Sequence, residues 1–329
     1  MQAVRIQPSQ GREPYSAANP APSSALALES HVAVPELKPG QVLVRVHATT
    51  VTRDELTWPE SYHHEYRIPG YDFSGIVERV CDSDNFKPGD EVYAMVSTTR
   101  GSTWAEYAMA EEHELALKPK NLSWAESVAV PLSALTAWQA LFVKAAGVSE
   151  PNFDAITKQK SERTLLVTGA SGAVGSYIVQ LGVQAGLHVV AASSSTERNG
   201  DFLRSLGADE VVEYADLSSK RSFDVIIDTV GGDVLSQAWD LVTDRGSLIS
   251  VESSSVEFAK AAPAGKEHVN AMFFILEPSG EQLSKLARAL ELGLVKPFLA
   301  YTFPLAEAKA AYEKANGRMD RKGKVVLTL

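Results

Sequence analysis

The chain has 329 residues, of which 45% are hydrophobic and 22% charged, and its formal net charge is −10 at pH 7. These are the proportions of a packed globular protein, and the acidic balance gives no general attraction to nucleic acid or to an anionic membrane. A single cysteine excludes an internal disulfide and a cysteine-rich zinc site. Because no apolar stretch of about 18 residues occurs and the N-terminus lacks the apolar core of a signal peptide, we expect a cytoplasmic protein.

The first part of the chain, to about residue 121, has the pattern of a β-rich domain. Residues 41–48 alternate polar and apolar side chains, as a half-buried strand does, and proline–glycine turn signals punctuate the region. Ser123 and Glu126 then form a predicted capping box. This box would open a long apolar helix that continues through Leu141.

From about residue 165 the pattern changes to alternating strands and helices. Such alternation predicts a parallel sheet with helices on both of its faces. After residue 277, two amphipathic helices and a last strand complete the chain. Strands are expected at 165–168, 188–192, 210–212, 225–228, 247–251 and 324–327, and helices between the earlier ones at 174–185 and 201–206.

A glycine-rich run between the first of these strands and its helix is the clearest chemical signal. Gly169 permits a tight turn, Gly172 lets the backbone approach a pyrophosphate, and Gly175 lets the helix pack on the sheet. The helix N-terminus presents free N–H groups to the anion. We therefore predict a dinucleotide site here, rather than a glycine-rich turn without a cofactor. The contacting residues are predicted to be Gly169, Ser171, Gly172, Ala173, Val174 and Gly175.

The second strand of this region ends in serines, whereas an NAD site usually carries an acidic residue there to bind the ribose. Ser194 and Ser195 can donate hydrogen bonds to a 2′-phosphate, and Arg198 can pair with it. A carboxylate in this place would repel the phosphate. The pattern therefore favours NADPH. Glu197 is the residue that would reverse this preference, and a solvated helix end is the alternative role of Arg198.

Together these features resemble the medium-chain dehydrogenase/reductase superfamily, and more narrowly its zinc-independent quinone oxidoreductases and enoyl reductases. The resemblance implies an α/β protein. A GroES-like β-rich catalytic domain, residues 1–121 and 278–329, would contain an inserted Rossmann domain, a doubly wound parallel sheet, at residues 122–277. The motifs that carry the resemblance, in chain order, are Pro69-Gly70-Tyr71-Asp72-Phe73-Ser74-Gly75, Gly89-Asp90-Glu91-Val92, Ala105-Glu106-Tyr107, residues 131–140, the glycine run, Asp228-Thr229-Val230-Gly231-Gly232 and residues 321–327.

The resemblance also implies positions for cofactor-binding residues. Thr136 would lie near the nicotinamide. Gly231 and Gly232 would lie beside the cofactor after the fourth strand. Lys324 would lie close to the phosphate or ribose on the nicotinamide side.

No catalytic zinc is expected from the same comparison. Zinc-dependent relatives carry Cys-His where this chain has Thr52-Arg53, and Gly-His-Glu where it has Gly70-Tyr71-Asp72. Thr52 and Tyr71 are not zinc ligands. The run His63-His64-Glu65 is interpreted as a solvated loop rather than a metal cluster.

The activity implied by the resemblance is hydride transfer from NADPH to a quinone or to the C=C bond of an α,β-unsaturated carbonyl compound. Thr52 stands where such reductases often carry a polar residue, and with Tyr62 and Thr136 it makes up the catalytic candidates. Tyr62 is the candidate proton donor or oxyanion partner, with packing as its alternative role. A tailoring reductase dedicated to one bulky intermediate, and a cofactor-binding protein without turnover, are the alternative functions.

Two segments bear on partners. The apolar segment 269–276 is expected to be a strand at the edge of the sheet, where an exposed apolar edge is a hazard. In similar proteins this edge pairs across a two-fold axis, so we expect a homodimer, with cover by the same chain as the alternative. The segment 147–163 is longer than the corresponding turn of the family and is expected to be a surface insertion; covering the cofactor or binding a partner are its alternative roles.

Overall fold

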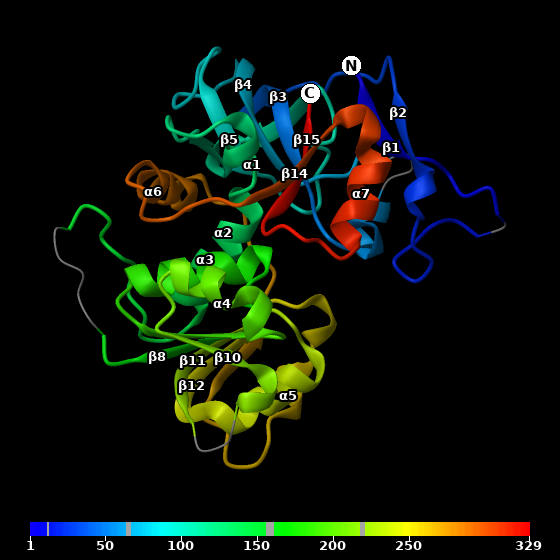
Figure 1. The fold of residues 1–329 in the computed structure, drawn as a ribbon. Helices are drawn as coiled ribbons and strands as arrows, with labels where there is room; N and C mark the ends of the chain where they lie inside the picture. The colour runs from blue at the N-terminus through cyan, green and yellow to red at the C-terminus, as the bar shows by residue number, and fades with distance from the viewer. Residues whose placement is uncertain (12, 64–66, 156–160, 218–220) are drawn as a thin grey trace. The chain divides into compact units, whose positions relative to one another are not determined.

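The computed structural model describes residues 1–329 except residue 12 and the segments 64–66, 156–160 and 218–220. Its internal contacts divide the chain into two units, which Figure 1 shows in chain-order colours. Unit 1 comprises Met1–Leu132, Glu277–Glu291 and Lys296–Leu329, and unit 2 comprises Ser133–Leu276 and Leu292–Val295. Unit 2 is therefore inserted into the sequence of unit 1.

Unit 1 is built on a mainly antiparallel sheet of seven strands. These are β3 Gln41–Val51, β4 Asp72–Cys81, β5 Glu91–Met95, β6 Tyr107–Glu111, β7 Leu115–Leu117, β14 Leu299–Pro304 and β15 Lys324–Thr328. Their order is β14-β15-β3-β4-β5-β7, and β6 pairs with β3 outside this path. Because β3 pairs with three neighbours, nearly all of its residues are buried, and the simple alternation expected for residues 41–48 is not seen.

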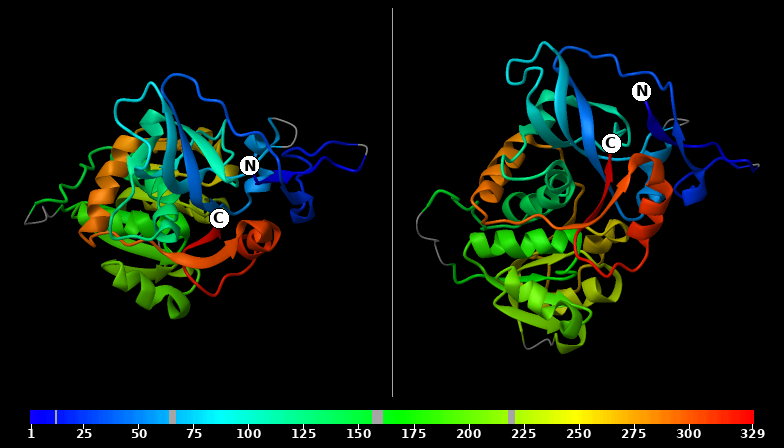
Figure 2. Two further views of the ribbon diagram at one scale, coloured as in Figure 1. Left: turned by 90° about the horizontal axis from the view of Figure 1, so that it is seen from above. Right: turned by 45° about the horizontal axis from the view of Figure 1, so that its top comes forward.

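The remaining elements of unit 1 surround this sheet. α6 packs against β7 and α7 against β15, and both views of Figure 2 show these two helices on opposite sides of the strands. The apolar side of α6 is buried, as its sequence predicts. The bounds are β1 Ala3–Ile6, β2 Leu26–Glu29, α1 Trp124–Val128, α6 Gly280–Glu291 and α7 Ala308–Asn316, with short 3-10 helices at η1 Ser23–Ala25, η2 Glu55–Thr57, η3 Pro59–Tyr62, η4 Glu112–Glu114 and η9 Leu305–Glu307.

Unit 2 contains a six-stranded sheet in which every pairing is parallel. Its strands are β8 Thr164–Val167, β9 His188–Ser193, β10 Glu210–Glu213, β11 Phe223–Asp228, β12 Val242–Ser250 and β13 Asn270–Phe273. Their order is β10-β9-β8-β11-β12-β13. The strand order therefore reverses between β8 and β11, and doubly wound sheets bind ligands at the carboxyl ends of the strands at such a point.

Helices cover both faces of this sheet, as the alternating pattern predicts (Figure 1). The helices are α2 Pro131–Trp138, α3 Ala173–Gln184, α4 Thr196–Ser205 and α5 Gly232–Leu241, with a π-helix η5 Gln139–Lys144 and short helices η6 Tyr214–Asp216, η7 Ser253–Ser255 and η8 Phe258–Ala261. In α3, Gly182 lies against Leu165 and Val189. The apolar residues of α5 pack instead with Leu166 and Val190, whose side chains point to the opposite face.

The prediction of one long helix from Ser123 through Leu141 is wrong, because the structure has a break within this segment. The capping box is present, because Ser123 accepts from the N–H of Glu126 and Glu126 accepts from the N–H of Ser123. The helix then ends at Val128, and a new one begins at Pro131, because proline has no N–H to continue the first helix but suits the first position of another. The apolar run Trp124–Lys144 is long enough to cross a membrane. However, 83% of an apolar stretch of 18 residues within it is buried inside the fold, as in a core helix.

Two further boundaries differ from the sequence prediction. The helix expected at 201–206 begins at Thr196, because Ser195 caps it with its side chain. The strand expected at 269–276 is the shorter β13, which lies at the edge of the sheet as predicted.

Candidate functional site

The glycine turn of unit 2 has a conformation that larger residues cannot adopt. Gly169 has φ +62°, and a Cβ there would lie 2.1 Å from Thr229 Oγ1. A Cβ on Gly175 would lie 2.3 Å from the carbonyl oxygen of Gly169 and 2.7 Å from the Cα of Ala170. Both glycines are therefore needed for the backbone to turn closely before α3.

The N-terminus of α3 is available to an anion. Gly172 is its N-cap and is exposed, and no side chain caps the helix. Ser171, Ala173 and Val174 are partly exposed around it. The first N–H groups of a helix have no partner within the helix, and here they meet the positive end of the helix dipole. The turn that we call the glycine cradle (residues 169–175) therefore fits the pyrophosphate of a dinucleotide.

A buried carboxylate ties the strands together beside the glycine cradle. Asp228, at the end of β11, accepts from Thr168 Oγ1 at 2.6 Å, from Gly231 N at 3.0 Å and from Ser250 Oγ at 2.9 Å. Gly231 has φ +74°. The carboxylate thus fixes the ends of β8, β11 and β12 and the turn into α5, which is a structural role that the sequence motif did not reveal.

Of the two serines at the end of β9 that were predicted to bind a 2′-phosphate, one is already used in a hydrogen bond within the protein. Ser194 is exposed, but Ser195 Oγ accepts from the N–H of Arg198 at 3.3 Å as the cap of α4. The side chain of Arg198 is exposed. A residue not singled out from the sequence lies close by, because Glu213 Oε1 accepts from the N–H and the hydroxyl of Thr196 at 2.7 and 3.0 Å.

Tyr214 also reaches the glycine cradle and was not found from the sequence. Its hydroxyl accepts from the N–H of Gly169 at 3.0 Å. Burial raises the pKa of Tyr214, so the hydroxyl keeps its proton at neutral pH. No motif marks this residue; only the packing of η6 brings it here.

Unit 1 holds a second group of polar residues, which we call the buried polar cluster (Thr50, Thr52, Glu55, Asp72 and Lys324). Lys324 Nζ lies 3.3 Å from Thr52 Oγ1 and 3.8 Å from Asp72 Oδ2. Asp72 also accepts from Thr50 Oγ1 at 2.6 Å and from the N–H of Leu132 at 2.8 Å. The lysine was predicted to contact the cofactor, and the structure places its ammonium group in this cluster.

The two carboxyl groups of the buried polar cluster hold their protons more strongly than usual. Burial raises the pKa of Glu55 to about 7, although the N–H groups of Gly70 and Thr52 bond to it and oppose the shift. Burial also raises the pKa of Asp72, and the charge of Lys324 opposes this. Glu55 can therefore hold and release a proton near neutral pH.

Thr52 is the member of the buried polar cluster that is partly exposed. Its oxygen faces the donating ammonium of Lys324, so its own proton is free to point toward a bound oxygen atom. The arrangement can therefore donate a hydrogen bond to a developing negative charge.

The other two catalytic candidates are not members of the buried polar cluster. The hydroxyl of Tyr62 donates to the carbonyl oxygen of Leu56 and accepts from the N–H of Ala21 at 2.8 Å, so its proton is already committed to the backbone. Tyr62 therefore has a packing role in the structure, against the apolar core of unit 1. Thr136 lies within α2 of unit 2 and is 6% exposed. Of the run 63–65, residues 64 and 65 lie outside the described residues, as do residues 156–160 of the expected insertion.

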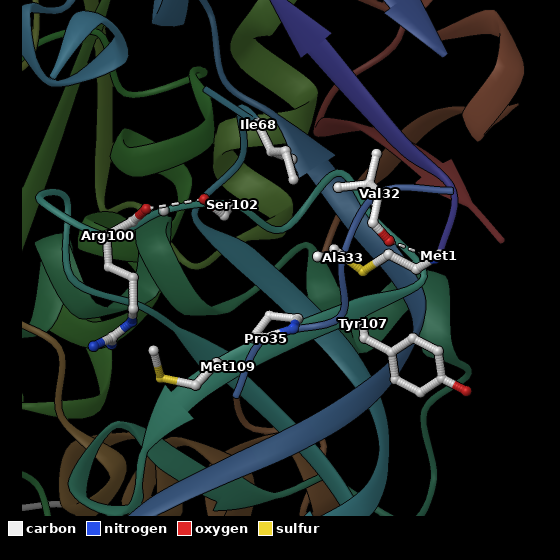
Figure 3. A pocket seen from close by; sticks show the side chains of 10 residues that line it. Met1, Val32, Ala33, Pro35, Ile68, Arg100, Ser102, Tyr107 and Met109 are labelled. Atoms are coloured by element: carbon white, nitrogen blue, oxygen red, sulfur yellow. Dashed lines mark hydrogen bonds between the residues drawn. The ribbon is translucent and has the colours of Figure 1, made fainter. Parts of the chain in front are cut away.

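Two hollows are lined by no residue of the glycine cradle or the buried polar cluster, although Gly232, predicted to lie beside the cofactor, lines the second. One in unit 1, of about 210 Å³, is shown in Figure 3, where apolar side chains such as Ile68 and Val32 line it and the guanidinium of Arg100 points away from them. Another in unit 2, of about 520 Å³, lies between α5 and η8, with Trp239 and Phe258 in its wall. The first contains no residue of the buried polar cluster, and we assign neither to the chemistry.

Comparisons with known proteins agree with this geometry. Residues 38–135 match the model of the alcohol dehydrogenase GroES-like domain, and residues 206–327 match that of a zinc-binding dehydrogenase. A probable mitochondrial zinc-binding oxidoreductase of Arthroderma benhamiae is 38% identical over an alignment of 340 positions that covers 99% of each chain. The NADPH-dependent alkenal/one oxidoreductase of Arabidopsis thaliana chloroplasts is 31% identical over 87% of this chain and 71% of its own. The quinone oxidoreductase structure from Coxiella burnetii has a TM-score of 0.83 and 25% identity, covering 100% of this chain and 99% of its own.

Zinc appears in two of these descriptions, but the residues present do not fit it. Thr52 and Tyr71 stand at positions where zinc-dependent relatives carry metal ligands, and both offer only hydroxyl groups. The Lys324 ammonium lies beside Asp72, the third such position. Within the described ranges, no group of three or more His, Cys, Asp or Glu side chains is placed to share a metal ion. Catalytic zinc needs about three nitrogen, sulfur or carboxylate ligands, and this donor set lacks them.

Proposed function

The chain belongs to the medium-chain dehydrogenase/reductase superfamily, and from this premise we propose that it is a zinc-independent, NADPH-dependent reductase. Its substrates would be α,β-unsaturated carbonyl compounds, reduced at their C=C bond, or quinones. The observation that carries this proposal is the contact of the Lys324 ammonium with Thr52, because it supplies an oxyanion donor without a metal. The names of the plant and bacterial relatives support the substrate class.

Each residue group has a distinct part in the proposed reaction. The bound nicotinamide would supply the hydride. The N–H groups of the glycine cradle hold its pyrophosphate. Thr52 donates a hydrogen bond to the carbonyl or quinone oxygen as negative charge develops there, Lys324 orients the hydroxyl and adds its positive charge, and Asp72 holds the ammonium in place.

NADPH, rather than NADH, is proposed from the end of β9. That strand ends in Ser193, with no carboxylate of its own, and the exposed Arg198 follows within one turn of α4. An arginine so placed can pair with a 2′-phosphate. NADPH in the name of the Arabidopsis relative supports the choice.

The edge strand β13 supports a proposed homodimer. Its residues are only partly buried, and Ile275 just beyond it is 57% exposed. Pairing of this edge with that of a second copy would cover both. Light scattering during gel filtration tests this, since a monomer at micromolar concentration would contradict it. We also propose a cytoplasmic location, to be tested by cell fractionation because the fungal relative is named as mitochondrial.

The test of the proposed activity is anaerobic oxidation of NADPH in the presence of enones and quinones. Turnover with several of these acceptors is expected. In Thr52→Val, kcat should fall on the order of 10²-fold with little change in the dissociation constant of NADPH, because an oxyanion donor is lost. Thr57→Val, which changes an exposed threonine on η2, is the matched control and should keep its kcat. Absence of turnover with every acceptor, or an unchanged kcat in Thr52→Val, would contradict the proposal.

A further inference from the structure

We propose that Glu213 limits the cofactor preference of this chain, by placing a carboxylate beside the 2′-phosphate position, which reduces the advantage of NADPH over NADH. The inference deepens the proposed function and rests on it. It concerns a residue of β10, one strand away from the place where sequence comparison looks for a ribose-binding carboxylate.

The strand register brings Glu213 to that place. β9 and β10 run parallel, and Glu213 is the register partner of Ser193, so both strands end at the same level of the sheet. Doubly wound dehydrogenases usually carry their ribose-binding carboxylate at the end of the second strand, which here is β9. This chain has only serines there, and the neighbouring strand supplies the carboxylate instead.

The contacts of Glu213 hold its carboxylate at the start of α4. Its Oε1 accepts from the N–H and the hydroxyl of Thr196. These two bonds, and to a smaller extent the charge of Arg198, lower the pKa of Glu213, so the group is ionised at neutral pH. A helix N-terminus that would attract a phosphate is thus already bonded to a carboxylate.

The Glu213 carboxylate also competes with the 2′-phosphate of NADPH for the positive charge of Arg198. Arg198 is exposed and lies in the first turn of α4, two residues after Thr196, whose N–H and hydroxyl hold the Glu213 carboxylate. A 2′-phosphate that approaches Arg198 therefore also approaches a negative charge, whereas a ribose 2′-hydroxyl can donate a hydrogen bond to it. The preference that Arg198 creates for NADPH is reduced, and the affinity for NADH is raised.

The test compares two probes that differ only in the phosphate, ADP-ribose and 2′-phospho-ADP-ribose, by calorimetric titration of the full chain. In Glu213→Gln, the amide oxygen can still accept from Thr196, so the bond that joins β10 to the start of α4 is kept. We expect this variant to bind 2′-phospho-ADP-ribose on the order of three- to tenfold more tightly and ADP-ribose no more tightly than the wild type. The gain should shrink as the salt concentration rises.

Glu210→Gln is the matched control, because Glu210 lies at the opposite end of the same strand and bonds to Arg221. It should leave both dissociation constants unchanged. An equal change for both probes in Glu213→Gln, or none, would overturn the inference about Glu213.

A third variant separates this result from the NADPH proposal. Arg198→Ala should weaken only the binding of 2′-phospho-ADP-ribose. If it leaves that binding unchanged, the basis proposed for NADPH use fails, whatever Glu213→Gln shows. If neither probe binds the wild-type chain, both ideas fail together, because the glycine cradle then does not hold a dinucleotide.

Discussion

The glycine cradle of unit 2 and the buried polar cluster of unit 1 are built in opposite ways. The cradle is made of backbone groups from consecutive residues, and its uncharged N–H groups lie at an exposed helix end. The cluster is made of side chains from distant segments: Lys324 and Thr52 are 272 positions apart, and their neighbour Asp72 is fully buried. A site of the first kind depends on local conformation, and one of the second kind depends on the whole fold and on the balance of buried charges.

The largest effect should come from removing the cation of the buried polar cluster. Lys324→Met leaves Asp72 buried without its ammonium, and breaking a buried ion pair in this way costs about 3–5 kcal/mol of unfolding free energy at neutral pH. Without the lysine, the pKa of Asp72 rises further above its unfolded value, so the loss should grow as pH rises above the ordinary titration range of an aspartate. Urea unfolding at several pH values measures this.

Lys309→Met is the control for that experiment, because Lys309 is exposed on α7. It should change the unfolding free energy by less than about 0.5 kcal/mol. If the loss of unfolding free energy in Lys324→Met does not depend on pH, the lysine contributes packing alone. The buried polar cluster would then not depend on a balance of charges, and the contrast with the glycine cradle would fail.

The next effect concerns Glu55. Its pKa is about 7 in the folded chain and about 4.5 when unfolded, so between these values the folded state holds a proton that the unfolded state lacks. Stability from this group is therefore lost as pH rises from about 4.5 to about 7, by about 3 kcal/mol in all. Glu55→Gln should remove most of this slope, while Asp72 keeps a slope of the same sign.

The measurement is urea unfolding at pH 5, 6, 7 and 8, with Glu36→Gln as an exposed control in the same unit. The control should follow the wild-type slope. If the unfolding free energy of Glu55→Gln has the same pH dependence as that of the wild type, Glu55 is ionised throughout this range. The other members of the buried polar cluster would then stabilise its buried charge.

The difference between the two regions explains what the sequence could predict. The turn of the cradle could be predicted from the spacing of its glycines, because Gly175 packs on the backbone of Gly169 and Ala170 a few residues before it. The contacts of Gly169 with the distant Thr229 and Tyr214 could not be predicted in this way. The parallel sheet followed from the alternation of its elements, and the family from an ordered series of motifs. In contrast, no spacing relates Glu55 to Lys324, and Glu213 reaches the end of β9 only through strand register. The break at Pro131 was visible in the sequence, but apolar periodicity continues across it.

The smallest of these effects tests the cradle directly. Gly175→Ala places a Cβ against the backbone of Gly169 and Ala170, which cannot move without opening the turn. We expect a loss of about 1–3 kcal/mol in unfolding free energy and weaker binding of ADP-ribose by at least about tenfold. Gly182→Ala in the same helix meets only the ends of the Leu165 and Val189 side chains, which can shift, so it should keep normal binding. Equal losses of binding in the two variants would mean that α3 as a whole, rather than the backbone of the turn, holds the ligand, and the cradle would then depend on packing as the buried polar cluster does.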